Sequence, residues 1–117
     1  MFEKKQDNYT DQLGKTNRIV EGTTISGNIV SKADLRLDGF LTGNIETDGK
    51  LVIGLAGKVI GDIICLNADI EGHFTGNIKV SQLLNVKTNA VIEGEVITAK
   101  LAVEPGAVFT ATCVMKQ

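Results

Sequence analysis

The stretch DGFLTGNI at residues 38–45 returns as EGHFTGNI at residues 71–78, 33 positions later. A recurrence at a fixed spacing indicates a repeat architecture. Both copies contain a shorter unit, Gly-x-aliphatic, whose five clear copies and one degraded copy begin at residues 27, 43, 61, 76, 94 and 111. These positions are 16, 18, 15, 18 and 17 residues apart, which predicts a repeat of about 17 residues.

Each repeat also has apolar residues at matching positions. The position two residues before the glycine is filled by Ile25, Leu41, Val59, Phe74, Ile92 and Phe109, a position farther upstream by Ile19, Leu37, Ile53, Ile70, Val86 and Val103, and the position two residues before that by Asn17, Leu35, Leu51, Ala68, Leu84 and Leu101. Apolar and polar residues alternate in short runs that end at Gly, Asn, Asp or Pro, which is typical of strands.

A strand of about five residues cannot bury its apolar face alone, so repeats of this kind are stable when they stack. Three short strands and their corners form one coil, and successive coils pair in a parallel ladder at about 4.8 Å. We therefore predict an all-β, single-domain parallel β-helix of about six coils. The predicted organisation is a flexible tail over residues 1–16, the β-helix over 17–115, and a short end at 116–117.

The predicted coils come in two lengths, and the sequence places the difference at one corner. The corner is tight in DGF (38–40) and EGH (71–73), whereas GLAGK (54–58), KTNAV (87–91) and EPGAV (104–108) have two more residues. Glycine and asparagine suit such corners because they adopt positive φ easily. The 13 glycines are thus explained without a ligand.

Composition argues against several classes of function. The net charge is −2, aromatic residues make up 4% and tryptophan is missing, so the chain lacks the basic and aromatic surface of a nucleic-acid-binding protein. The sequence has no apolar run of the length that spans a membrane. Residues 1–18 are polar and do not resemble a secretion signal, which predicts a cytoplasmic protein.

The residues with chemical potential have structural interpretations. Cys65 and Cys113 fall at positions that apolar or small residues occupy in other coils, and His73 is the only histidine, whereas a metal site needs three or four ligands. GLAGKVIG (54–61) lacks the spacing and the Ser/Thr of a phosphate-binding loop, so we interpret it as a wide corner. We predict no catalytic residue, no metal and no cofactor, and hence no enzyme.

A row of polar residues follows the glycines. Asn28, Asn44 and Asn77 align with Asp62 and Glu95. We interpret the row as a solvated face with some side-chain hydrogen bonding along the ladder; a recognition strip is the alternative.

The sequence resembles the bactofilins, a family of bacterial cytoskeletal proteins. The resemblance covers residues 17–115 and rests on RIVEGTTISGNI (18–29), the GNI repeats, LVIGLAGKVIGDI (51–63) and the ending LAVEPGAVFTATCVM (101–115). It implies a right-handed β-helix that polymerises into nonpolar filaments without a nucleotide. It also implies a location at the inner face of the cell membrane, and sides that bind cell-wall or envelope proteins in support of cell shape.

Polymerisation also follows from the expected ends of the stack. The first and last coils present unpaired backbone groups, and such edges attract another chain. We predict a polymer interface formed by Phe109, Val103 and Met115 at one end and by Ile19 and Ile25 at the other. The sequence leaves open whether like ends meet or copies stack head to tail.

The N-terminus, MFEKK, resembles the short membrane-targeting segment of many bactofilins. Met1 and Phe2 are the apolar residues and Lys4 and Lys5 the basic ones. We predict that this tail binds the membrane surface; the alternative is a tail with an incidental phenylalanine.

Two other functions fit a β-helix. The first is a left-handed hexapeptide-repeat acyltransferase, but such coils keep a nearly strict 18-residue period and generally use histidines. The second is an ice- or glycan-binding solenoid, which needs a regular Thr or aromatic array on one outer face. The irregular spacing and the single histidine favour the cytoskeletal scaffold.

Overall fold

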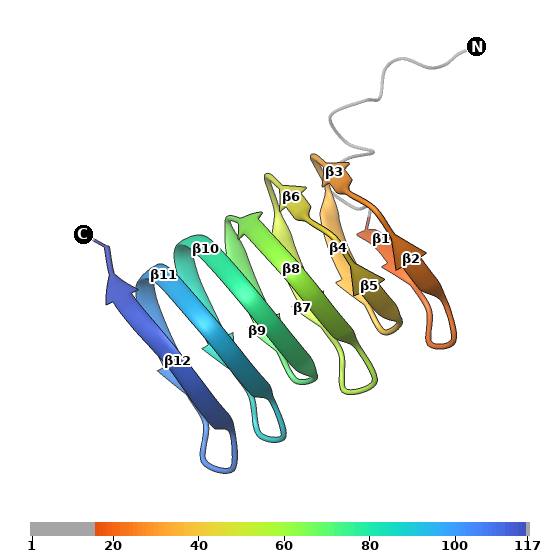
Figure 1. The fold of residues 1–117 in the computed structure, drawn as a ribbon. Coiled ribbons are helices and arrows are strands. Elements are labelled where there is room, and N and C mark those ends of the chain that lie inside the picture. Colours follow the sequence, from red (N-terminus) through yellow and green to blue (C-terminus); the bar gives the residue numbers. More distant parts are fainter. Residues whose placement is uncertain (1–15, 117) are drawn as a thin grey trace.

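The chain forms a β-solenoid of six coils, and the computed structural model describes residues 16–116. No helix occurs among these residues, and the coils stack in a row from the first strand to the last (Figure 1). The strands are β1 (Thr16–Ile19), β2 (Thr24–Ser26), β3 (Ile29–Ser31), β4 (Asp34–Leu37), β5 (Phe40–Thr42), β6 (Ile45–Thr47), β7 (Lys50–Ile53), β8 (Lys58–Cys65), β9 (Asn67–Ile70), β10 (His73–Val86), β11 (Val91–Val103) and β12 (Val108–Met115).

Each coil has three sides. In the first coil these are the separate strands β1, β2 and β3, which pair with β4, β5 and β6 of the second coil. Later strands continue around corners, so that β8 covers the second and third sides of coil 3. Every pairing between described strands is parallel and joins neighbouring coils.

The observed register confirms the alignment predicted from the repeats. On the second side Leu41 pairs with both Ile25 and Val59, and Ile92 pairs with Phe109. The pairs of the first side likewise continue from coil to coil, from Ile19–Leu37 to Val86–Val103. Alternation therefore predicted which side chains point inward, because a one-residue slip would have turned each of them to the surface.

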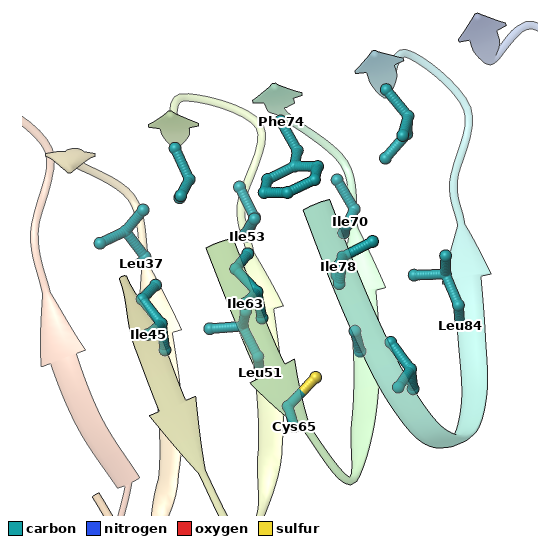
Figure 2. Packing of buried hydrophobic residues seen from close by; sticks show 14 of the residues in the cluster. Leu37, Ile45, Leu51, Ile53, Ile63, Cys65, Ile70, Phe74, Ile78 and Leu84 are labelled. Atoms are coloured by element: carbon teal, nitrogen blue, oxygen red, sulfur yellow. The ribbon is translucent and has the colours of Figure 1, made fainter. Parts of the chain in front are cut away.

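These inward side chains form one continuous core along the rod (Figure 2). Leu37, Leu51 and Ile53 are fully buried, and each large apolar side chain contributes about 1.5–3 kcal/mol on burial. Two threonines, Thr47 and Thr98, are also buried. Their hydroxyls donate to the carbonyls of Ala33 (2.8 Å) and Lys100 (2.9 Å), which satisfies the corner between the third side and the next coil.

The coil lengths vary at two corners, so the prediction of one variable corner was wrong. The first corner behaves as expected: 38–39 and 71–72 are tight, whereas Gly57 donates to Gly54 (2.9 Å) across a wide turn. The corner that leads to the next coil also varies, because two residues separate β3 from β4 but only Leu66 separates β8 from β9. This difference adds one residue without changing which side chains face inward, so alternation does not reveal it.

Glycines close the corner between the second and third sides. Gly61 has φ 148°, and a Cβ there would collide with the carbonyl oxygen of Gly43 in the preceding coil. The sixth coil has Ala111 opposite Gly94. Asn89 is the only non-glycine residue with positive φ in the described range, so the corner at Ala111 has a different backbone conformation.

The row of outward asparagines makes the hydrogen bonds along the ladder that its interpretation predicted. The Asn28 side-chain oxygen accepts from the backbone N–H of Asn44 (3.2 Å), and the Asn44 side-chain oxygen accepts from the N–H of Asp62 (3.2 Å). Asn77 then donates to the Asp62 carboxylate (3.3 Å). The row thus links four successive coils at the glycine corner.

Candidate assembly surfaces at the ends of the rod

The sixth coil is the end of the core. Val103 and Phe109 continue inward rows of the inner coils, and Met115 continues the row of Cys65, Val80 and Thr98. Three predicted interface residues therefore lie together on one end face, beyond which the described chain has no further coil (Figure 1).

Exposure shows how incompletely this end is covered. Val103 is 46% exposed and Met115 51%, whereas Val86 and Thr98, one coil inward in the same rows, are 0% exposed. Phe109 is partly buried. These side chains lack the apolar neighbours on the outer side that the inner coils provide, and an exposed apolar patch of this kind marks an interaction site.

Two residues outside the predicted interface belong to the same end face. Leu101 and Cys113 are partly buried members of the inward rows, and the Cys113 thiol lies 3.7 Å from the Met115 sulfur. Their positions in the inward rows of the last coil could have predicted this, because every inward side chain of that coil has a neighbouring coil on one side only.

The opposite end has a different chemistry. Ile19 and Ile25 are partly buried there, together with Ile29, which lies outside the predicted interface. Asn17, in an inward row, donates from its side-chain amide to the Ser31 hydroxyl (2.9 Å). This end of the described chain thus combines three isoleucines with a polar pair, whereas the other end combines apolar side chains with two sulfurs.

The backbone is also incompletely paired at both ends. Among the described strands β12 pairs only with β11, and β1, β2 and β3 pair only with β4, β5 and β6. In a parallel ladder each strand directs N–H and C=O groups to both sides. Each terminal coil therefore offers three strand edges to another chain.

The other candidate residues lie along the rod and do not converge. Cys65 is buried, and burial raises the pKa of its thiol to about 12, as expected for an inert packing residue. His73 is exposed, and residues 16–116 contain no cluster of His, Cys, Asp or Glu with the geometry of a metal site. Residues 54–58 form a wide corner, as predicted.

Tight corners leave hollows between the wide ones. Val20 and Leu55 project from the wide corners of coils 1 and 3 above an open groove of 540 Å³. In its floor Arg36 donates two hydrogen bonds to the Asp38 carboxylate (2.9 and 3.1 Å), which raise the pKa of the guanidinium. Because the Arg36 and Asp38 charges neutralise each other, neither is well suited to bind an ion.

The predicted membrane-binding residues Met1, Phe2, Lys4 and Lys5 lie outside the described residues. In the range that the structure covers, 16–116, none of the secondary structure is a helix suited to crossing a bilayer.

Comparison with known proteins identifies relatives. The bactofilin family profile, described as polymer-forming cytoskeletal, matches residues 17–114. Bactofilin BacO of Myxococcus xanthus is 32% identical over 85 residues, which cover 73% of this chain and 68% of BacO.

Solved structures agree in fold. The solid-state NMR structure of the cytoskeletal bactofilin BacA superposes with a TM-score of 0.78 at 24% identity, over 87% of this chain and 97% of BacA. The cryo-EM reconstruction of Thermus thermophilus bactofilin double helical filaments gives 0.77 at 23% identity, over 86% and 99%. With the family profile covering nearly all of the solenoid and BacO aligned over 73% of the chain, the chain belongs to the bactofilin family of filament-forming cytoskeletal proteins.

Proposed function

We propose that this bactofilin is a scaffold, not an enzyme, and that it stacks end to end into nonpolar filaments without a nucleotide. The filaments lie at the inner face of the cell membrane, and their sides hold cell-wall or envelope proteins in support of cell shape. The relative from Thermus thermophilus, solved as double helical filaments, supports assembly by a rod of this fold.

The observation that carries the proposal is the contrast between the last coil and the coils within. Val103 is 46% exposed where Val86 is fully buried, and the edge of β12 has no described partner. A second copy stacked on this end would supply both the missing strand edge and the missing apolar neighbours. Full burial of one such side chain stabilises by about 1.5–3 kcal/mol.

The chemistry of the two ends favours contact between like ends. A head-to-tail junction would set the apolar Leu101 and Met115 beneath the polar Asn17 and Ser31, which continue the same two rows. In contact between like ends, the apolar C-terminal faces meet each other. At the N-terminal contact, Asn17 and Ser31 of one molecule face the same two residues of the other. Polar groups buried without partners cost stability, so the matched arrangement is preferred.

Phe109→Arg tests the C-terminal end. The substitution places a charge in the proposed contact, where an unpaired buried charge is strongly unfavourable. We expect a folded, β-rich protein by circular dichroism that forms no long filaments by electron microscopy in nucleotide-free buffer, whereas wild type forms them.

Two controls accompany this variant. Thr110→Arg puts the same charge on an exposed residue of β12 and should leave filaments intact. Phe74→Arg, in the fully packed coil 4, should unfold the protein. Long filaments from folded Phe109→Arg protein would exclude the C-terminal end as an assembly surface.

Mixing distinguishes the two directions of stacking. With like-end contacts Phe109→Arg stops at a dimer joined through N-terminal ends, and Ile25→Arg at a dimer joined through C-terminal ends. With head-to-tail contacts each variant alone is a monomer, and dimers form only when the two are mixed. Light scattering of the separate and mixed variants reads out the difference, and monomers that pair only on mixing would contradict a nonpolar filament.

Membrane association is proposed for the N-terminal residues. Insertion of Met1 and Phe2 gives about 3–4 kcal/mol before entropic costs, and each lysine adds about 1 kcal/mol near anionic lipid. One tail binds weakly, whereas a filament with many tails binds by avidity. We expect wild-type filaments to sediment with anionic liposomes, and Phe2→Glu and the short assemblies of Phe109→Arg to stay in the supernatant. Equal pelleting of wild type and Phe2→Glu would remove the membrane role.

A further inference from the structure

The third side of every coil carries one outward side chain, and the parallel register joins these into a row. We call it the outer row; its members, from coil 1 to coil 6, are Val30, Glu46, Ile64, Lys79, Ile97 and Val114.

The outer row is largely apolar, since four of its six members are Val or Ile. Val30 is 77% exposed, Ile64 49% and Val114 55%. A shallow hollow of 190 Å³ lies beside its central part and is lined by Ile64, Lys79 and Ile97. Exposed apolar side chains that line up over several strands indicate a contact surface.

The charges in the row have a particular order. Glu46 belongs to coil 2 and Lys79 to coil 4, and both adjoin Ile64 of coil 3 in the register. Both are exposed, and within residues 16–116 neither takes part in a salt bridge. The two tight coils thus carry opposite charges at equal distances from a central isoleucine.

With Ile64 of one copy opposite Ile64 of the other, this order is complementary to itself in one orientation only. When two copies face each other with their coils in opposite directions and Ile64 meets Ile64, Glu46 of each copy faces Lys79 of the other, and Val30 faces Ile97. When the coils run in the same direction and Ile64 again meets Ile64, Glu46 meets Glu46 and Lys79 meets Lys79. Like charges across an interface cost several kcal/mol, and an isologous contact requires this kind of self-complementarity.

We propose that the outer row is a lateral contact between two copies of this chain, paired in antiparallel orientation about a two-fold axis at Ile64. A single pair covers only one narrow side of a short rod and is weak. Along two filaments many such pairs act together. A stable lateral contact therefore depends on the proposed end-to-end assembly.

Cross-linking at the axis tests the contact. In a Cys65→Val, Cys113→Val background, Ile64→Cys places a thiol where the pair predicts two copies to meet, and a short bismaleimide should join them into a covalent dimer. End-to-end neighbours cannot produce this product, because coil 3 of two stacked copies lies at least about 24 Å apart. Filaments that give no cross-link overturn the proposal, whereas a protein without filaments shows a failure of end-to-end assembly.

Charge variants of the cross-linking protein test the orientation. Glu46→Lys alone and Lys79→Glu alone each set like charges opposite one another, and we expect the dimer yield to fall roughly tenfold or more. The double variant, Glu46→Lys with Lys79→Glu, restores complementarity and should cross-link like the parent. An equal mixture of the two single variants should cross-link too, because each supplies the charges that the other needs.

Other outcomes overturn the antiparallel pair. Same-direction pairing would leave the parent and the double variant without cross-links and would give them only in the mixture. Equal yields from all variants would show that the charges do not specify the contact. Anionic vesicles that protect position 64 from maleimide, without any cross-link, would identify the row as a lipid-facing surface. Filament length by electron microscopy should be unchanged in every charge variant, so failure of end-to-end assembly is recognised separately.

Discussion

At the scale of the residue, one absent atom fixes how closely the coils approach. At Gly61 the backbone has φ 148°, and a Cβ would strike the carbonyl oxygen of Gly43. Gly27 has φ 139° but belongs to the first coil, and nothing lies within 4 Å of where its Cβ would be. Comparison of the two positions therefore distinguishes the cost of positive φ, which both share, from the cost of a collision between coils, which occurs only at Gly61.

Gly61→Ala should therefore be far more destabilising than Gly27→Ala. Positive φ alone costs about 1–3 kcal/mol for a residue with a side chain, and only position 61 adds a collision with fixed backbone. We expect a correspondingly lower denaturation midpoint for Gly61→Ala by circular dichroism, measured for both variants in an Ile25→Arg, Phe109→Arg background, in which both end contacts are blocked and assembly stays out of the comparison. Equal midpoints would mean that the close approach of the backbones at Gly61 does not limit which side chain this position accepts.

A pH effect follows from the buried thiol. The pKa of Cys65 is raised from 9.0 to about 12 by desolvation, so above pH 9 the unfolded chain loses the proton and the folded chain keeps it. Stability from this group is complete below pH 9 and falls by up to about 1.4 kcal/mol per pH unit between pH 9 and 12.

Cys65→Val, which copies the Val80 of the next coil, should lack this loss while changing stability only modestly at pH 7 and leaving filaments intact. Denaturation curves from pH 7 to 10.5 give the difference between the two proteins. Parallel curves for the two proteins would show that the thiol is not buried, and lost assembly in folded Cys65→Val would show a functional thiol.

At the scale of the element, the sequence predicted the inward rows because a strand's period of two ties each side chain to one face. The extra corner residue, as between β3 and β4, was missed because it lies outside any alternating run. The end surfaces were predicted from position alone, since the last coil is as apolar as the others. The outer row was not predicted, because alternation identifies the residues of the core. The opposite charges of Glu46 and Lys79 form a pattern only when the coils are stacked.

The terminal strand β12 should change most on assembly. Its outer edge has no described partner, so the amides on that edge exchange readily in the short assemblies of Phe109→Arg and should become protected in wild-type filaments. Amides of β9, which has partners on both sides in β7 and β10, serve as the internal control. Hydrogen exchange with mass spectrometry measures both segments; unchanged exchange in β12 would place the subunit contact elsewhere.

At the scale of the whole molecule, stability is a sum over neighbouring coils, because each coil touches only the next. Residues 51–83 comprise one wide and one tight coil, and a tandem copy of them continues every inward row without a break in register. We expect the eight-coil protein to fold and to unfold at a higher temperature. In filaments, the axial length of each subunit should increase by about 9.6 Å.

Electron microscopy of filaments from both proteins gives the subunit repeat, and calorimetry gives the unfolding temperature. Since both end faces are kept, assembly should be unaffected. A longer chain that fails to fold would show that the coils depend on contacts beyond their neighbours.

The ladder bonds join coil to coil, so they point along the rod. Tension on a filament therefore pulls every bond at a boundary lengthwise and together, with the three sides sharing the load. Boundaries inside a molecule are reinforced by the covalent chain that crosses them, whereas the joint between molecules has no such tether. An overstretched filament should snap at these joints, and because a break regenerates the original end faces, the fragments can anneal.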